Sequence, residues 1–373
     1  AGAFSKYDFS DKLKGKFQQS FSLELVSNGG YMQFFIRTNS RYRDLVEASI
    51  YAQYPEAEIM EVGDYAETIR ANFPESEYDL WGAEIILSKE FPYPIRTYPQ
   101  FEHSLSAEFK DPMASLLENL SRLRPGEQAW LQIIITPIPQ KPWQKEGEKV
   151  YKKLIGAKVK EKESHIDKGL GFLWSIAYSF VAELFGDITG GDEKKEKSEP
   201  SQISYLSPGE VNVVKAVQDK ISKIGFDVKF RTAYIARKEL FSAARGKSAI
   251  VGALNQFGSL DVNRFKAKKM VGAKYVLKAR RKAEKKNRFL KAYMNRDTST
   301  GFPMYVLNIE ELASVYHFPS IGVKAPLIKK TESRRAEPPT ALPMEEEVPQ
   351  VATAIEEVKE EKEETPFNLP IEE

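Results

Sequence analysis

The sequence contains no cysteine and only three histidines, His103, His165 and His317. Without cysteine there is no disulfide framework, no thiolate zinc site and no cysteine nucleophile. With so few histidines, a histidine-rich metal site is not expected either. We therefore predict no metal and no cofactor, although the absence of cysteine does not fix the cellular compartment.

The sequence also lacks the motifs of common catalytic classes. Arg245-Gly246-Lys247-Ser248 matches the end of a phosphate-binding loop, but that loop needs a glycine five residues before Gly246, where Phe241 stands. No nucleophile-elbow pattern surrounds a serine. No carboxylate pair is framed by apolar residues, as acid–base catalysis requires. We predict that the protein is not an enzyme.

The chain starts at Ala1-Gly2, with neither an initiator methionine nor a signal peptide. We expect that upstream sequence is missing, and a membrane anchor is one option for it.

The composition of the sequence indicates packed domains. The 373 residues are 42% hydrophobic and 12% aromatic, which suits two or three domains of ~100–200 residues each.

Residues 20–140 are predicted to form a first α+β unit. Strands are expected over 20–27, 31–37, 58–62, 81–88 and 129–135, and helices over 40–53 and 112–123. Asn28-Gly29-Gly30 is a hairpin-turn signal, and Asp111-Pro112 starts a helix with proline in its first turn. The apolar strand 129–135 is expected to be central, and the element order is typical of a ferredoxin-like α/β sandwich.

Residues 203–319 are predicted to form a second unit of the same class. Ser207-Pro208-Gly209-Glu210 is a capping box that starts a helix. A strand over 226–236, a helix over 238–254, a strand over 303–307 and a helix over 309–318 are then expected. The fold class is therefore α+β, with two ferredoxin-like units.

Three further segments complete the predicted organisation. Residues 1–19 are a polar, basic N-terminal segment. Residues 141–202 contain a charged helix, an apolar amphipathic helix and a mobile linker rich in Gly, Lys, Glu and Ser. Residues 320–373 form an irregular strap and then an acidic tail that is expected to be disordered.

The most apolar window is 169–186. Three interpretations of it stay open: a membrane-spanning helix of nearly the required ~20 residues, an interfacial helix, and a helix packed on its own domain or on a partner. Glu183 on the opposite face argues against lipid on all sides. The predicted membrane or partner face consists of Leu170, Leu173, Trp174, Ala177, Phe180, Val181 and Leu184.

Residues 264–296 carry 14 lysines and arginines against one acid, Glu284. Such a density suits nucleic-acid phosphates or anionic lipid headgroups. A solvated helix with Val276, Phe289, Leu290 and Tyr293 as its buried stripe is the plainer alternative. The polyanion-binding candidates are Lys268, Lys269, Lys274, Lys278, Arg280, Arg281, Lys282, Lys285, Lys286 and Arg288. Contact between this stretch and the acidic tail is a further hypothesis.

Asn308 to Pro319 is a short helix pattern ended by a proline, and it is followed by Ser333-Arg334-Arg335-Ala336-Glu337-Pro338-Pro339. This stretch resembles the junction that precedes the ATP-binding core in conjugation and secretion ATPases of the HerA/VirD4/FtsK type. Its candidate motif residues are Glu310, Glu311, Leu312, Tyr316, His317, Phe318 and Pro319.

The segments 21–27, 42–48 and 50–59 are similar to a region that accompanies type IV secretion ATPases in bacteria of the candidate phyla, and the likeness covers about 17–343. Here an acidic tail stands where the ATPase core would follow. The resemblance implies a non-catalytic accessory protein, peripheral on the cytoplasmic face of the membrane, that docks or positions a DNA- or protein-translocating ATPase. The alternative is a stand-alone nucleic-acid-binding module that uses residues 264–296. The sequence does not indicate the cargo or the oligomeric state, and an oligomer is one option.

Overall fold

The computed structural model describes residues 18–69, 72–101, 111–156, 206–273 and 277–319. The strands are β1 (Phe21–Asn28), β2 (Tyr31–Arg37), β3 (Tyr78–Leu87), β4 (Glu127–Pro137), β5 (Gly225–Arg237), β6 (Phe265–Lys269) and β7 (Tyr305–Asn308). The helices are α2 (Arg43–Tyr51), α3 (Pro112–Ser121), α4 (Gln140–Leu154), α6 (Pro208–Ile221), α7 (Ala243–Leu254), α8 (Lys278–Met294) and α9 (Ile309–Val315).

All of these strands belong to one antiparallel sheet with the order β2-β1-β4-β5-β3-β6. The seventh strand, β7, also pairs with β5. This is possible because β5 is 13 residues long. Its segment 225–228 pairs with β7, and its segment 230–237 pairs with β3.

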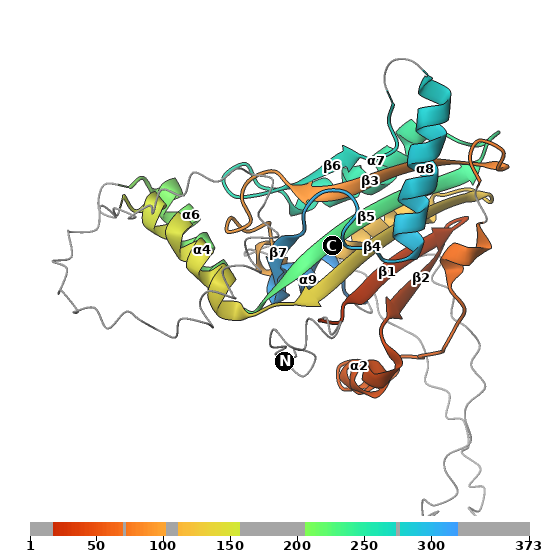
Figure 1. Cartoon of the computed structure of the whole chain (residues 1–373). Coiled ribbons are helices and arrows are strands. Elements are labelled where there is room, and N and C mark those ends of the chain that lie inside the picture. The colour runs from red at the N-terminus through yellow and green to blue at the C-terminus, as the bar shows by residue number, and fades with distance from the viewer. Residues whose placement is uncertain (1–17, 70–71, 102–110, 157–205, 274–276, 320–373) are drawn as a thin grey trace, which may run out of the picture. The chain divides into compact units, whose positions relative to one another are not determined.

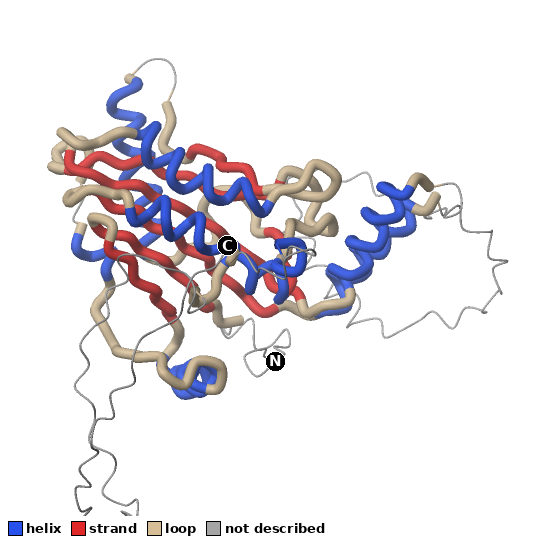
Figure 2. Tube along the Cα trace, turned by 180° about the vertical axis from the view of Figure 1, so that it is seen from behind, coloured by secondary structure: helices blue, strands red, loops and turns tan. Residues whose placement is uncertain are grey.

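Helices cover both faces of the sheet. One face packs an extensive apolar cluster against α3, α7 and α9, and Figure 2 shows these helices in front of the strands. The other face carries a smaller apolar cluster under α8, which crosses in front of the strands in Figure 1. Side chains alternate between the faces along each strand. On β4, for example, Ala129 and Leu131 belong to the first cluster and Trp130 to the second.

Helices α4 and α6 form an antiparallel pair next to the sheet (Figure 1). α4 follows β4 and α6 precedes β5. The pair packs closely because Gly147 on α4 has no side chain to overlap Ile221 on α6. The ring of Trp143 lies in the same way over Gly225 at the start of β5.

The mixed α+β class is confirmed, but two separate ferredoxin-like units are not. Strands from both predicted units pair with one another, since β4 lies beside β5 and β3 lies between β5 and β6. Periodicity indicates which residues form strands, but it does not say which strands pair. The mobile linker, the acidic tail, the window 169–186 and Lys274 lie outside the described residues.

The predictions of several individual elements are confirmed, and others are wrong. The hairpin turn at Gly29 and Gly30 has positive φ at both residues, and the capping box of α6 is present. The strand expected over 58–62 is not formed, and this acidic segment is largely exposed and pairs with no strand. The helix expected from Lys238 begins at Ala243, capped by Ser242. β6 was not predicted at all.

No helix in the described part of the chain combines the length and the apolar character needed to cross a membrane.

Candidate functional site

A row of buried polar side chains crosses the sheet on the α8 face. Glu24 on β1 is the register partner of Gln132 on β4, which partners Arg231 on β5, which partners Glu84 on β3. These four residues are at most 2% exposed. The row continues to the half-buried Lys268 on β6. Charged groups in this position are costly unless each has a partner.

Each carboxylate of the row is paired. Glu84 accepts from Arg231 Nε at 3.1 Å and lies 3.4 Å from Lys229 Nζ. It also accepts from the backbone N–H of Phe302 at 2.6 Å. Glu24 is held by Arg296, whose Nε and Nη2 donate to its two oxygens at 3.0 Å each. Such two-pronged contacts fix geometry as well as charge.

The row also holds the end of α8. The last carbonyls of a helix lack partners inside the helix and carry partial negative charge. Here Arg231 Nη1 donates to the carbonyl of Ala292 at 3.2 Å, and Gln132 Nε2 donates to that of Tyr293 at 3.0 Å. Arg296 Nη1 donates to the carbonyl of Met294 at 2.7 Å. The C-terminal turn of α8 is therefore fastened to the sheet.

The loop after α8 closes over the same groups. Arg231 Nη2 donates to the carbonyl of Thr300 at 2.7 Å, and Lys229 donates to that of Phe302. Gly301 has a φ of 100° and lies directly against Glu84, so that any side chain there would overlap the carboxylate. Only glycine fits both the backbone conformation and the space.

Arg296 and Asp64 both favour their ionised forms, because they pair with each other. Burial lowers the pKa of Arg296, but its hydrogen bonds to Asp64 and Glu24 outweigh burial and raise it. Burial likewise raises the pKa of Asp64, yet Arg296 brings the net value below its ordinary level. Burial lowers the pKa of Lys229 and raises that of the Tyr293 phenol. The cluster is thus an ionic network that is buried apart from the partly exposed Asp64, and its Gln132 Oε1 is a buried atom without a partner in the described structure.

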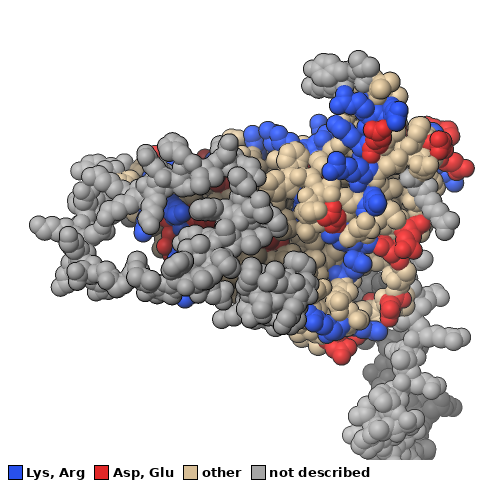
Figure 3. All heavy atoms as spheres, in the orientation of Figure 1, with Lys and Arg blue, Asp and Glu red and all other residues tan. Residues whose placement is uncertain are grey.

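The outer side of α8 is basic. Figure 3 shows Lys and Arg side chains over this helix, with acidic residues beside it. Among the predicted polyanion-binding residues, the exposed ones are Lys269, Lys278, Arg280, Arg281, Lys285 and Arg288, whereas Lys282 is half-buried. We call Lys278, Arg280, Arg281, Lys285 and Arg288 the α8 basic face.

Lys286 does not belong to this face. It is buried, pairs with Asp79 and stacks over the ring of Phe73 at 5.2 Å. Phe289, Leu290 and Tyr293 form the buried stripe of α8, as expected.

The predicted junction residues pack onto the chain itself. Glu311 closes a capping box with Asn308 at the start of α9 and forms a fully buried ion pair with Lys220 on α6 at 2.9 Å. Leu312 is buried in the core. Glu311 and Leu312 are therefore closed to a partner, while Glu310 and residues 316–319 stay partly exposed.

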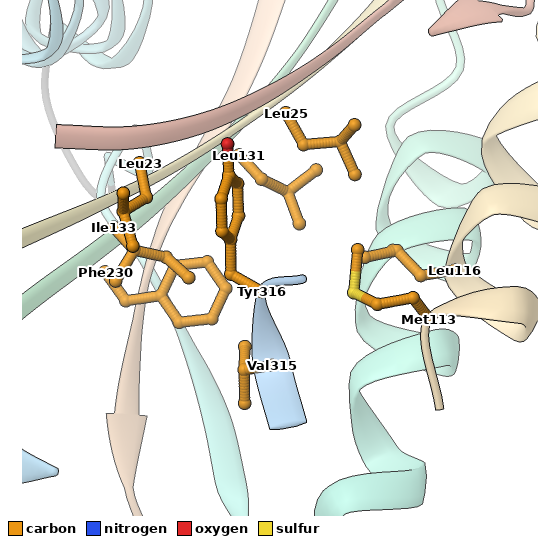
Figure 4. Close-up of a pocket in the computed structure, with 9 residues that line it drawn as sticks. All are labelled: Leu23, Leu25, Met113, Leu116, Leu131, Ile133, Phe230, Val315 and Tyr316. Carbon is orange, nitrogen blue, oxygen red and sulfur yellow. The ribbon is translucent and has the colours of Figure 1, made fainter. Parts of the chain in front are cut away.

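Two residues of the junction make further internal contacts. His317 Nε2 lies 2.9 Å from Asp111 at the start of α3. The Tyr316 hydroxyl donates to the carbonyl of Phe35 on β2 at 3.2 Å. Tyr316 also lines a small cavity (Figure 4) whose other walls are apolar side chains such as Leu23, Met113 and Phe230. With about 10 Å³ for the centre of a water molecule, the cavity holds at most about one water.

The segment Arg245 to Ser248 is not a phosphate-binding loop, because it lies inside α7. Gly246 is needed there because its Cα packs against the ring of Tyr234, where a side chain would overlap the ring. In the part of the chain that is described, no group of three or more His, Asp or Glu side chains is placed to hold a metal ion.

The described structure is that of a mixed α+β protein built on one antiparallel sheet, in which a largely buried ionic network holds the C-terminal end of a basic helix. The chain belongs to the family of the domain of unknown function DUF8128, whose family model matches residues 14–331. A search of curated proteins gives no match, and neither does a search of solved structures.

Proposed function

We propose that this protein is a non-catalytic accessory scaffold that docks or positions a translocating ATPase of the HerA/VirD4/FtsK type, and that the α8 basic face contacts a polyanion in that assembly. The setting is inferred from the resemblance of residues 17–343 to regions that accompany such ATPases. DNA is the polyanion that a conjugation-like machine would bring to this surface.

The observation that carries the polyanion contact is the division of α8 into two sides. Its inner side is fixed by Arg231, Gln132 and the buried pair of Lys286 with Asp79. Its outer side presents five exposed cations over about three turns. A helix that is held rigidly loses little conformational entropy when it binds, so its cations can act together. The plainer alternative, a merely solvated helix, requires that these cations bind nothing.

A titration of the full chain with duplex DNA at several salt concentrations tests the contact. The substitutions Lys278→Gln, Arg281→Gln, Lys285→Gln and Arg288→Gln, made together, should weaken binding. They should also flatten the dependence of log K on log salt by about one for each residue that contacts a phosphate. A matched control replaces Lys141, Lys145, Lys149 and Lys152 on α4 with Gln. Equal binding by both variants would contradict an α8 contact.

The second candidate, a stand-alone nucleic-acid-binding module, uses the same face. The two candidates differ in the partners they predict. For the stand-alone module, DNA would bind to the chain in its host, and no translocating ATPase would be found with it.

A further inference from the structure

Five lysines lie on one side of α4. Lys141, Lys145, Lys149, Lys152 and Lys153 are all exposed. At about 100° per residue, they fall within an arc of about 120° around the helix. We call them the α4 lysine face.

The opposite side of α4 is the packed one. Trp143 and Gly147 are the buried residues of this helix. Gln144 Nε2 donates to the carbonyl of Ile221 on α6 at 3.0 Å, and Gly147 allows α6 to approach closely. Since α6 lies against this side, the α4 lysine face points away from α6.

The lysines of this face are not used within the described structure. No ion pair or hydrogen bond there involves the ammonium groups of Lys141, Lys145, Lys149, Lys152 or Lys153. Glu146 and Glu148 border the arc, but they leave a net charge of about +3 on this side. On α8, by contrast, Arg280 pairs with Glu284 at 3.1 Å, and Lys285 donates to the carbonyl of Gly272 at 2.7 Å.

We propose that the α4 lysine face binds the anionic phosphodiester headgroups of a phospholipid surface. The face is the exposed outer side of a helix, so it fits a charged surface rather than an enclosed small ligand. The sequence favours lipid over nucleic acid at this place. α4 ends at Leu154, 15 residues before the apolar, aromatic window that begins at Gly169, and lysines close to apolar aromatic residues are typical of chains that lie at a membrane surface.

The test uses the full chain and co-sedimentation with vesicles. One set consists of phosphatidylcholine alone and another of phosphatidylcholine mixed with phosphatidylglycerol. Each lysine near an anionic surface contributes about fivefold to binding. The triple variant Lys141→Gln, Lys145→Gln, Lys149→Gln should therefore bind the anionic vesicles on the order of 100-fold more weakly than the unmodified chain, with the loss largest at low salt.

A matched variant on α8, Lys278→Gln, Lys282→Gln, Lys285→Gln, removes the same charge elsewhere and should keep most of the vesicle binding. Duplex DNA serves as the second probe, and the α4 variant should bind it nearly as the unmodified chain does. Three results would overturn the proposal: unchanged vesicle binding by the α4 variant, an equal loss in the α8 variant, or a loss confined to DNA. The two basic faces are on different helices, so the failure of this site is distinguishable from the failure of the ATPase-scaffold proposal.

Discussion

Arg231 on β5 and Glu84 on β3 are register partners, and their side chains form an ion pair of 3.1 Å that is at most 2% exposed. Arg231 does more than neutralise Glu84. It also binds the carbonyls of Ala292 and Thr300, so that one guanidinium connects the central strand, the end of α8 and the loop beyond. The position of the α8 basic face thus depends on groups that no partner can reach.

Removing the carboxylate of Glu84 should strongly destabilise the folded protein. Glu84→Ala leaves Arg231 and Lys229 buried without their carboxylate, which should cost about 3–5 kcal/mol of the free energy of unfolding. Urea denaturation followed by circular dichroism measures it. In the control, Glu284→Ala, the lost partner of Arg280 is exposed, and the cost should be below about 1 kcal/mol. Similar losses in both variants would contradict the assigned role of Glu84.

Gly301 should be intolerant of a methyl group. Gly301→Ala places a side chain onto the carboxylate of Glu84 at a φ of 100°, and we expect a loss of about 1–3 kcal/mol in the free energy of unfolding. Gly252→Ala is the matched control, because a Cβ there meets nothing within 4 Å and alanine favours a helix such as α7 by about 0.5–1 kcal/mol. Thermal unfolding of both variants compares them directly. A Gly301→Ala protein as stable as the unmodified chain would refute the close contact.

Asp227 should make stability depend on pH. Burial, and then the nearby Glu146 on α4, raise the pKa of Asp227 to about 6 from the ordinary 3.8. Between these values the folded state binds more protons than the unfolded state. This contribution to stability is therefore lost as the pH rises through the folded pKa. Asp227→Asn should be stabilised relative to the unmodified chain, on the order of 2 kcal/mol more at about pH 7 than at about pH 4.

Denaturation curves at both pH values give this difference. Glu148→Gln on the same helix serves as the control for a general change of charge. If the advantage of Asp227→Asn is the same at both pH values, Asp227 does not titrate as described.

Substitutions at Lys286 and Arg288 distinguish the basic residues of α8 that stabilise the fold from those that bind DNA. Lys286→Gln leaves Asp79 without its buried cation, so the free energy of unfolding should fall by about 1–3 kcal/mol. The salt dependence of DNA binding should stay unchanged, because this side chain does not reach the surface. Arg288→Gln should give the reverse pattern, with little change in stability and a flatter salt dependence. The same DNA titration and urea curves measure both variants. If Lys286→Gln also flattened the salt dependence of DNA binding, Lys286 would belong to the α8 basic face after all.

Local signals predicted many elements but not the site. The turn at Gly29 and Gly30, the cap at Ser207 and the central strand β4 depend on neighbouring residues, and so the sequence predicts them well. β6 was missed because its lysines suggested a binding surface. Lysines are also a common way to protect the edge strand of a sheet from pairing with another chain.

The polar row was missed for a different reason. Its members come from five strands that are spread along the sequence, and their register follows from pairing alone. One signal was available: Lys229 and Arg231 alternate with Val228 and Phe230 on a long strand. Cations at alternate positions of a buried strand require an acid on a neighbouring strand, which Glu84 on β3 supplies to both.

The most direct test of the central claim is a quantitative affinity capture of the tagged chain from cross-linked membranes of its own host, with mass spectrometry of the captured proteins. An untagged strain and the four-residue α8 variant are processed in parallel. The scaffold proposal predicts specific enrichment of a HerA/VirD4/FtsK-type ATPase with the tagged chain. Recovery of nucleic acid without any such ATPase would contradict it and would favour the stand-alone nucleic-acid-binding module.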